Sequence, residues 1–302
     1  MSTLRFHLFG AARVARDGGE GLQEIPVRPA GWSLLAYLLL FRDRAHSRER
    51  LTDLFWRDQE ERRARQCLRT TLWRLRRALK PDRCIVAGGE GQLRFDDGQH
   101  HWLDVAEFEE QTARGLSLPL AQMTPAEAKC LERARLLYVG DLLPDIYHDW
   151  ALREQERLRL LHLKGLERLL HYYQDQRLYE RALDCGQKIL EQDPLREGIH
   201  QGMMSLYLAN GQRAQAVEQY NRCEAALAEE LHIAPMAKTQ GLLAQALGTL
   251  ARGTIARSDS IRDRPSTLRQ AMHQLTEAAQ LLDETARQLE VIVGLISRHV
   301  EH

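Results

Sequence analysis

One predicted helix, over residues 60–79, constrains the fold of this chain more than any other segment. Apolar residues recur along it at helical spacing and form a continuous stripe: Ala64, Leu68, Leu72, Leu75 and Leu79. Between residues 62 and 80 the segment also carries seven arginines and one lysine, and no acidic residue. Such a helix has to bury one side in a core and leave its other sides strongly basic.

The side of this helix opposite the stripe carries side chains suited to reading DNA. At about 100° per residue, six residues project away from the stripe: Arg63, Gln66, Thr70, Trp73, Arg74 and Arg77. Arginine donates two hydrogen bonds to guanine, glutamine pairs with adenine and threonine meets a thymine methyl group, while flanking arginines such as Arg62 and Arg69 hold phosphates. We therefore predict that this helix enters the major groove. The alternative is a solvated basic face, although cations without intervening acids repel one another.

Strand and helix signals surround this helix within the first hundred residues. Alternating runs over residues 4–14 and 23–27 predict a small sheet, and residues 32–41 predict an apolar helix. Ser47 is placed to cap a further short helix. After Pro81, residues 84–86 and 92–95 predict a hairpin across a glycine-rich turn, with Arg94 available to a phosphate. This order predicts a winged helix in which the hairpin is the wing.

Charge is distributed unevenly along the chain. The net charge is zero, yet residues 1–106 hold 19 Lys and Arg against 14 Asp and Glu. This asymmetry favours a polyanionic partner for the first part of the chain. No apolar run approaches the roughly 20 residues of a membrane span, and no signal peptide is recognisable, so we expect a cytoplasmic protein without a membrane partner.

The middle of the chain repeats itself with an offset of 34 residues. Four positions of one unit, Leu169, Leu170, Tyr173 and Ala182, recur as Met203, Met204, Tyr207 and Ala216. A period of 34 with small residues where helices cross is typical of tetratricopeptide (TPR) repeats, which offer a concave surface to a partner. An ordinary helical bundle is the alternative.

Two blocks of the sequence resemble a known family. Residues 69–79, RTTLWRLRRAL, look like the recognition helix of the Streptomyces antibiotic regulatory proteins (SARP), whose DNA-binding domain is OmpR-like. Residues 138–144 (YVGDLLP), 149–150 (DW) and 154–158 (EQERL) are similar to the opening of their bacterial transcriptional activator domain, and residues 227–235 (LAEELHIAP) to its close. The chain departs from the pattern at His232, where glycine is usual, and at Trp73, where a small or polar residue is expected.

The resemblance covers residues 4–250 and implies a regulator that binds repeated promoter sites cooperatively and recruits RNA polymerase holoenzyme. No enzyme is indicated, because the sequence contains no HExxH motif, no phosphate-binding GxxxxGK[ST] loop and no recognisable Ser/His/Asp arrangement. Five scattered cysteines without a CxxC pair indicate neither a disulfide framework nor a zinc ribbon. We therefore expect no metal and no cofactor.

The last segment has the pattern of a self-association helix. After a linker over residues 251–265, Ser266 is a fair N-cap, and apolar residues follow in heptads. The positions expected to form the contact are Leu268, Met272, Leu275, Leu282, Leu289, Val293 and Ile296. Additional apolar residues widen the stripe, so an antiparallel pair or a four-helix bundle is as compatible as a parallel dimer. A helix folded back on the repeats is the alternative to self-association.

Together these features predict a mainly α protein with a small α+β winged-helix domain over residues 1–103. A TPR-like bacterial transcriptional activator domain would follow over 104–250, then the linker and the long coiled-coil-like helix over 266–302. The predicted function is that of a transcriptional activator that binds double-stranded promoter DNA as a homo-oligomer. The alternative is a TPR-like adaptor whose basic helix binds an acidic protein.

Overall fold

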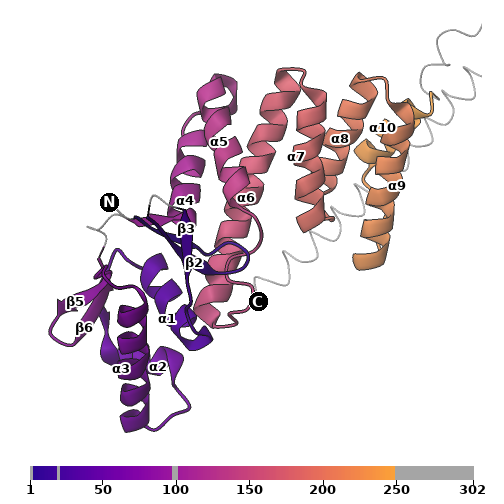
Figure 1. Ribbon diagram of the computed structural model, residues 1–302. Helices are drawn as coiled ribbons and strands as arrows, with labels where there is room; N and C mark the ends of the chain where they lie inside the picture. Colours follow the sequence, from indigo (N-terminus) through magenta and orange to yellow (C-terminus); the bar gives the residue numbers. More distant parts are fainter. Residues whose placement is uncertain (1–2, 19–20, 97–100, 249–302) are drawn as a thin grey trace, which may run out of the picture. The chain divides into compact units, whose positions relative to one another are not determined.

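The computed structural model describes residues 3–18, 21–96 and 101–248, and it is mainly helical after a small region of strands and helices (Figure 1). The strands are β1 (Thr3–His7), β2 (Arg13–Asp17), β3 (Leu22–Ile25), β4 (His46–Ser47), β5 (Ile85–Gly89), β6 (Gln92–Phe95) and β7 (His101–Leu103). The helices of the first region are α1 (Pro29–Leu40), α2 (Arg48–Phe55) and α3 (Glu61–Ala78). Those that follow are α4 (Asp104–Gly115), the short 3-10 helix η1 (Leu120–Gln122), α5 (Pro125–Leu137), α6 (Asp149–Asp175), α7 (Tyr179–Gln192), α8 (Glu197–Ala209), α9 (Arg213–Glu230) and α10 (Ala237–Ala246).

The predicted linker and heptad helix, residues 251–302, lie outside the described residues. Within the described ranges, no helix is both long enough and apolar enough to cross a membrane.

The first sheet has the strand order β3-β2-β1-β7. β1 pairs antiparallel with β2, and alternation places Leu4 and Phe6 in the core. The run expected over residues 4–14 is divided into these two strands by a turn at Gly10, whose φ of 68° favours glycine. β7 was not expected; it pairs in parallel with β1 and so joins the start of the chain to the segment before α4.

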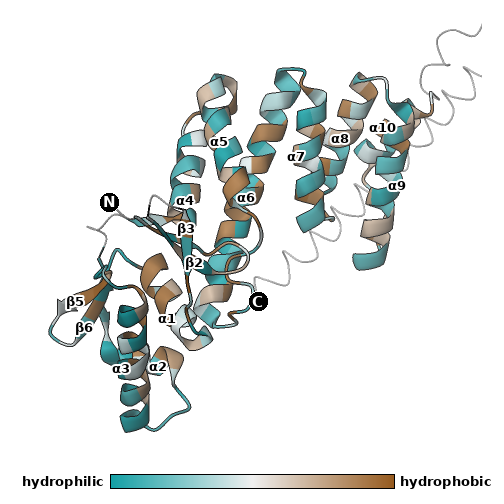
Figure 2. Cartoon of the chain, viewed as in Figure 1, coloured by the Kyte–Doolittle hydropathy of each residue, from teal (hydrophilic) through white to brown (hydrophobic). Residues whose placement is uncertain are grey.

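Three helices follow in the order that the sequence predicts, and α3 packs against both α1 and α2. α1 begins at Pro29, three residues before the predicted start, because proline suits the first turn of a helix. It is apolar on most of its surface, whereas α3 is largely hydrophilic (Figure 2). Ser47 caps α2 as predicted, since its hydroxyl accepts a hydrogen bond from the Arg50 amide at 3.1 Å.

The predicted hairpin is present as strands β5 and β6, which pair antiparallel. The two-residue strand β4 directly precedes α2. It pairs with the β6 edge of the hairpin and gives a sheet of order β4-β6-β5. A bulge lies between Ala87 and Gly89. Gly88 cannot accept a side chain, because a Cβ atom there would lie 2.6 Å from that of Ala45. With α1, α2 and α3, this hairpin completes a winged helix.

From α4 onward the chain forms antiparallel helix pairs, α4 with α5, α6 with α7 and α8 with α9 (Figure 1). The predicted 34-residue period holds in the packing, because Ala182 and Ala216 are both fully buried. It also holds in the turns. Arg177 and Gly211 both take left-handed conformations, with φ of 58° and 74°. The backbone amides after them, in Leu178 and Gln212, bond the carbonyls of Tyr173 and Tyr207 at 2.9 and 2.8 Å.

The winged helix and the helical pairs meet around one buried carboxylate. Asp104, the first residue of α4, is 3% exposed. One of its oxygens accepts the backbone N–H groups of Leu8 and Phe9 at 2.7 and 3.0 Å, and the other accepts that of Val105 at 2.7 Å. Burial raises the pKa of Asp104 to about 6, although the three N–H groups oppose that shift. Trp150 of α6 extends the joint, since its ring packs edge-on to Tyr37 of α1.

Candidate nucleic-acid interface

Helix α3 sits in the winged helix as its apolar stripe predicts. Ala64, Leu68, Leu72, Leu75 and Leu79 are each less than 5% exposed. Gly31 of α1 allows a close approach, because a Cβ atom there would lie 3.1 Å from the side chain of Leu75. The apolar contacts therefore fix the rotation of α3 about its axis, and with it the residues that face outward.

The C-terminal end of the basic segment is tied to two neighbouring strands. Arg16 of β2 donates to the carbonyl oxygens of Leu79 and Lys80 at 3.0 and 2.7 Å, and pairs with Asp82 at 2.9 Å. Arg76 donates to the carbonyl oxygen of Ile85 in β5 at 3.1 Å. Arg16 thus satisfies carbonyls that the end of a helix leaves without partners, and Arg76 joins α3 to the wing.

The six residues predicted to face outward lie together on α3. Five are exposed and Thr70 is half-buried: Arg63, Gln66, Thr70, Trp73, Arg74 and Arg77. Trp73 is 58% exposed, and the Arg77 guanidinium lies 5.3 Å from the centre of its ring. A large exposed indole with a cation on its face presents an apolar edge and a positive charge in one place. Arg62 and Arg69 are exposed beside this face.

The cations of α3 divide into those with internal partners and those without. Arg65 pairs with Glu61 one turn earlier, and Arg76 bonds the wing. Within the part of the chain that the structure describes, Arg62, Arg63, Arg69 and Arg74 form no ion pair. Their charges are therefore available to an external anion. Neither Arg65 nor Arg76 was among the residues predicted to bind DNA.

The wing places one further predicted residue at the surface. Leu93 and Phe95 of β6 are buried, so Arg94 between them points outward on the exposed face of the hairpin. Arg94 lies opposite Val86 of β5. The wing thus adds a cation on a strand, separate from the helix.

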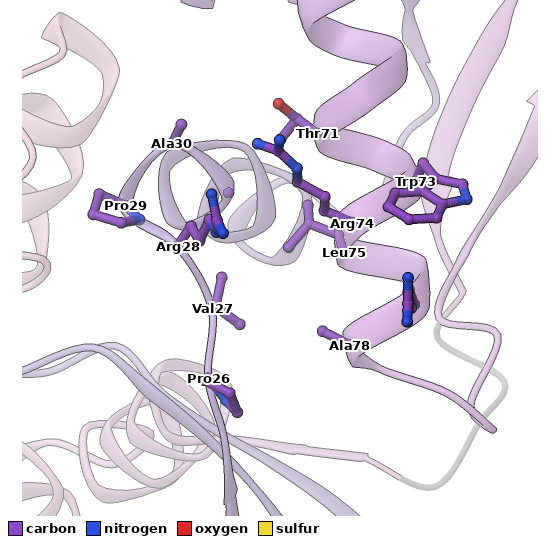
Figure 3. Close-up of a pocket in the computed structure, with 12 residues that line it drawn as sticks. Pro26, Val27, Arg28, Pro29, Ala30, Thr71, Trp73, Arg74, Leu75 and Ala78 are labelled. Carbon is purple, nitrogen blue, oxygen red and sulfur yellow. The ribbon is translucent and has the colours of Figure 1, made fainter.

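A groove of about 690 Å³ runs along one flank of α3, between that helix and the start of α1 (Figure 3). Its walls are residues 26–31 on one side and six residues of α3 on the other: Thr71, Trp73, Arg74, Leu75, Arg77 and Ala78. Arg28 and Arg74 point into it from opposite walls, and Trp73, which borders the groove, extends from the other side of α3 (Figure 3). Sequence reasoning missed Arg28, because it precedes a helix and belongs to no periodic pattern.

Within the described ranges, no three His, Cys, Asp or Glu side chains lie close enough together to hold a metal ion.

Comparison with known proteins agrees with this architecture. The family model of the bacterial transcriptional activator domain matches residues 103–247. Regulatory protein AfsR of Streptomyces coelicolor is 27% identical over 297 residues, which is 96% of this chain. The chain belongs to the SARP-type regulators. It spans only 29% of the length of that AfsR protein.

Two further proteins are similar to this chain. Transcriptional regulatory protein MoaR1 of Mycobacterium bovis is 26% identical over 220 residues, 68% of each chain. The structure of Mycobacterium tuberculosis EmbR in complex with a low-affinity phosphopeptide superposes with a TM-score of 0.66 at 17% identity, covering 94% of this chain and 72% of EmbR. The second likeness shows a shared fold.

The turn after α9 differs from the usual family pattern. His232 stands where glycine is usual in SARP proteins, and it takes the left-handed conformation, with a φ of 55°. Its ring nitrogen Nδ1 lies 2.9 Å from the carbonyl oxygen of Ala228 in the last turn of α9. A side-chain hydrogen bond thus accompanies a backbone conformation that glycine adopts without strain.

Proposed function

We propose that this SARP-type regulator binds double-stranded promoter DNA through the outward face of α3 and activates transcription. The observation that carries the proposal is the set of exposed, unpaired arginines on a helix whose opposite face is locked in the core. Mutual repulsion among these cations is relieved when phosphates neutralise them. Exposed Gln66 and half-buried Thr70 on the same face supply groups that distinguish base pairs.

In this proposal the parts of the interface have different tasks. Arg63, Gln66, Thr70 and Arg77 face the floor of the major groove and read base edges. Arg62 and Arg69 hold phosphates beside the helix, and Arg94 holds one at the wing. Trp73 packs its ring against the sugars or a thymine methyl group, because an exposed indole needs an apolar contact.

We further propose that residues 1–103 form the DNA-binding domain and that residues 104–250 contact RNA polymerase holoenzyme. Homo-oligomerisation through the heptads of residues 266–302 would let several copies bind repeated sites together. Neither a catalytic role nor a cofactor belongs to this proposal. The antiparallel helix pairs and the unpaired cations of α3 support it.

The test is binding of the purified chain to a duplex from the region upstream of its own gene, with Arg63→Glu plus Arg77→Glu as the variant. Reversal of two groove-facing charges is expected to weaken binding on the order of a thousandfold, because like charges then face the DNA. The matched control is Arg133→Glu plus Arg213→Glu, which makes the same change in net charge at exposed positions of α5 and α9.

Two results would overturn the proposal. If the wild-type chain bound no duplex at low salt, the basic face would instead serve an acidic protein partner. If both double variants lost the same affinity, net charge rather than α3 would account for binding. Both double variants are expected to give the circular dichroism spectrum of wild type, because all four substituted residues are exposed.

A further inference from the structure

Three arginines line the groove beside α3, and two of them, Arg28 and Arg74, face each other without an anion between them. Arg28 and Arg74 are both exposed and point into the groove from opposite walls (Figure 3). No acidic residue lines this groove. Neither arginine forms an ion pair or a hydrogen bond through its side chain within residues 3–18, 21–96 and 101–248. An anion bound between them would relieve the repulsion.

The walls of the groove are rigid enough to present both charges in fixed places. Pro26 and Pro29 restrict the segment that carries Arg28, since each proline fixes its own backbone angle. Arg74 lies next to Leu75, which is 2% exposed and packs against Gly31 of the facing wall. The distance between the two positions is thus set by buried contacts on either side.

The position of Arg74 on α3 places it at the groove, apart from Arg63, Gln66 and Thr70 of the outward face. Arg63, Gln66 and Thr70 do not line the groove, whereas six residues toward the end of α3 do: Thr71, Trp73, Arg74, Leu75, Arg77 and Ala78. Trp73, the residue before Arg74, points to the opposite side of the helix (Figure 3). Arg74 is therefore turned toward the flank of α3, where the edge of a major groove would pass.

We propose that this groove seats the sugar-phosphate backbone of one DNA strand, with Arg28 and Arg74 on its phosphates. This inference rests on the proposed function, and it assigns Arg74 to the backbone instead of a base. A groove of about 690 Å³ with apolar walls accommodates sugars as well as phosphates. Arg94 on the wing and the Arg28–Arg74 pair then lie on different sides of α3 and contact the two strands that border one major groove.

The inference predicts a pattern that a base-reading arginine would not give. Arg28→Ala and Arg74→Ala are each expected to weaken binding roughly tenfold, the loss of one charged hydrogen bond. Each is also expected to lower the slope of log K against log salt by about 1, because one fewer counterion is released. Arg28→Lys is expected to keep most of the affinity, since a phosphate accepts a point charge.

The experiment is selection from a randomised duplex library with the full chain, followed by salt titration on the selected duplex. Wild type, Arg28→Ala and Arg74→Ala are expected to select the same sequence, whereas Gln66→Ala selects a relaxed one. Arg133→Ala, an exposed arginine of α5, is the control and is expected to match wild type in affinity and slope.

Different failures have different meanings. Wild-type affinity and slope in Arg28→Ala would overturn the inference while leaving DNA binding by α3 intact. A changed base preference in Arg74→Ala would return Arg74 to base reading and also overturn it. Absence of any duplex binding by the wild-type chain would overturn the proposed function itself.

Discussion

Helix α3 and the helices from α4 onward use arginine in opposite ways. On α3 most arginines have no internal partner and face outward. In the later helices arginine repeatedly meets a carboxylate: Arg157 bonds Glu109 and Glu154, Arg159 bonds Glu156, and Arg135 pairs with Glu132 and Asp184.

This contrast separates charge that serves the fold from charge that is available for binding. A matched cation adds little to external attraction, since its partner cancels its field within a few ångströms. An unmatched cation on a fixed helix keeps its attraction for a polyanion. Net charge conceals the difference, because the sum over the whole chain is zero.

The largest expected effect concerns Asp104, the buried carboxylate whose hydrogen bonds are all made within the fold. Asp104→Ala leaves three buried N–H groups without an acceptor and is expected to lower the free energy of unfolding by about 4 kcal/mol. Urea unfolding measures this loss. Glu110→Ala removes an exposed acid of the same helix and is expected to change stability by less than about 0.5 kcal/mol. Equal losses in both variants would mean that Asp104 is not a special contact.

The same carboxylate gives this comparison a pH dependence. The pKa of Asp104 is about 6 in the folded chain and 3.8 as its ordinary value, so between these values the folded state binds more protons. The advantage of wild type over Asp104→Ala is therefore greatest below about pH 4. It falls by about 3 kcal/mol as the pH rises from about 4 to about 6. Unfolding of both proteins at pH 4.5 and 7 checks the sign. An advantage that grew with pH would contradict it.

A pair of single arginine variants sharpens the contrast between the two regions. If α3 binds DNA as proposed, Arg63→Ala is expected to weaken that binding about tenfold with no loss of stability, since Arg63 forms no ion pair within the described residues. Arg157→Ala is expected to lower stability by less than about 1 kcal/mol, because its side chain is 47% exposed and its ion pairs are screened. Its DNA affinity should equal that of wild type. Thermal unfolding measures stability and fluorescence anisotropy measures DNA affinity on the same samples. A loss of stability in Arg63→Ala or a loss of affinity in Arg157→Ala would contradict the prediction.

The smallest effects are expected in the turns of the repeats, where the backbone conformation of the residue matters more than its charge. Arg177→Gly is expected to raise stability by about 0.5 kcal/mol, because glycine adopts a φ of 58° without strain. Gly211→Ala makes the reverse change at the equivalent turn and is expected to lower stability by about 1 kcal/mol. DNA affinity should not change in either variant. Matching signs for the two substitutions would show that the turns are not equivalent.

Periodicity in the sequence was sufficient to predict the elements that carry the candidate interface. The stripe from Ala64 to Leu79 determined which side of α3 is buried, since an apolar row at helical spacing has one favourable rotation. The cap at Ser47, the wing over residues 84–95 and the 34-residue period were also readable, because each depends on neighbours close in sequence.

Contacts between distant segments were decided only by the tertiary structure. β7 pairs with β1 across nearly a hundred residues, and Asp104 accepts its hydrogen bonds from Leu8 and Phe9. Arg28 meets Arg74 across a groove for the same reason: two walls formed by separate segments bring them together. Local sequence patterns do not predict which distant segments will lie next to each other. The sequence by itself therefore determined which helix is basic and which side is free, and the packing of remote segments decided what lies beside it.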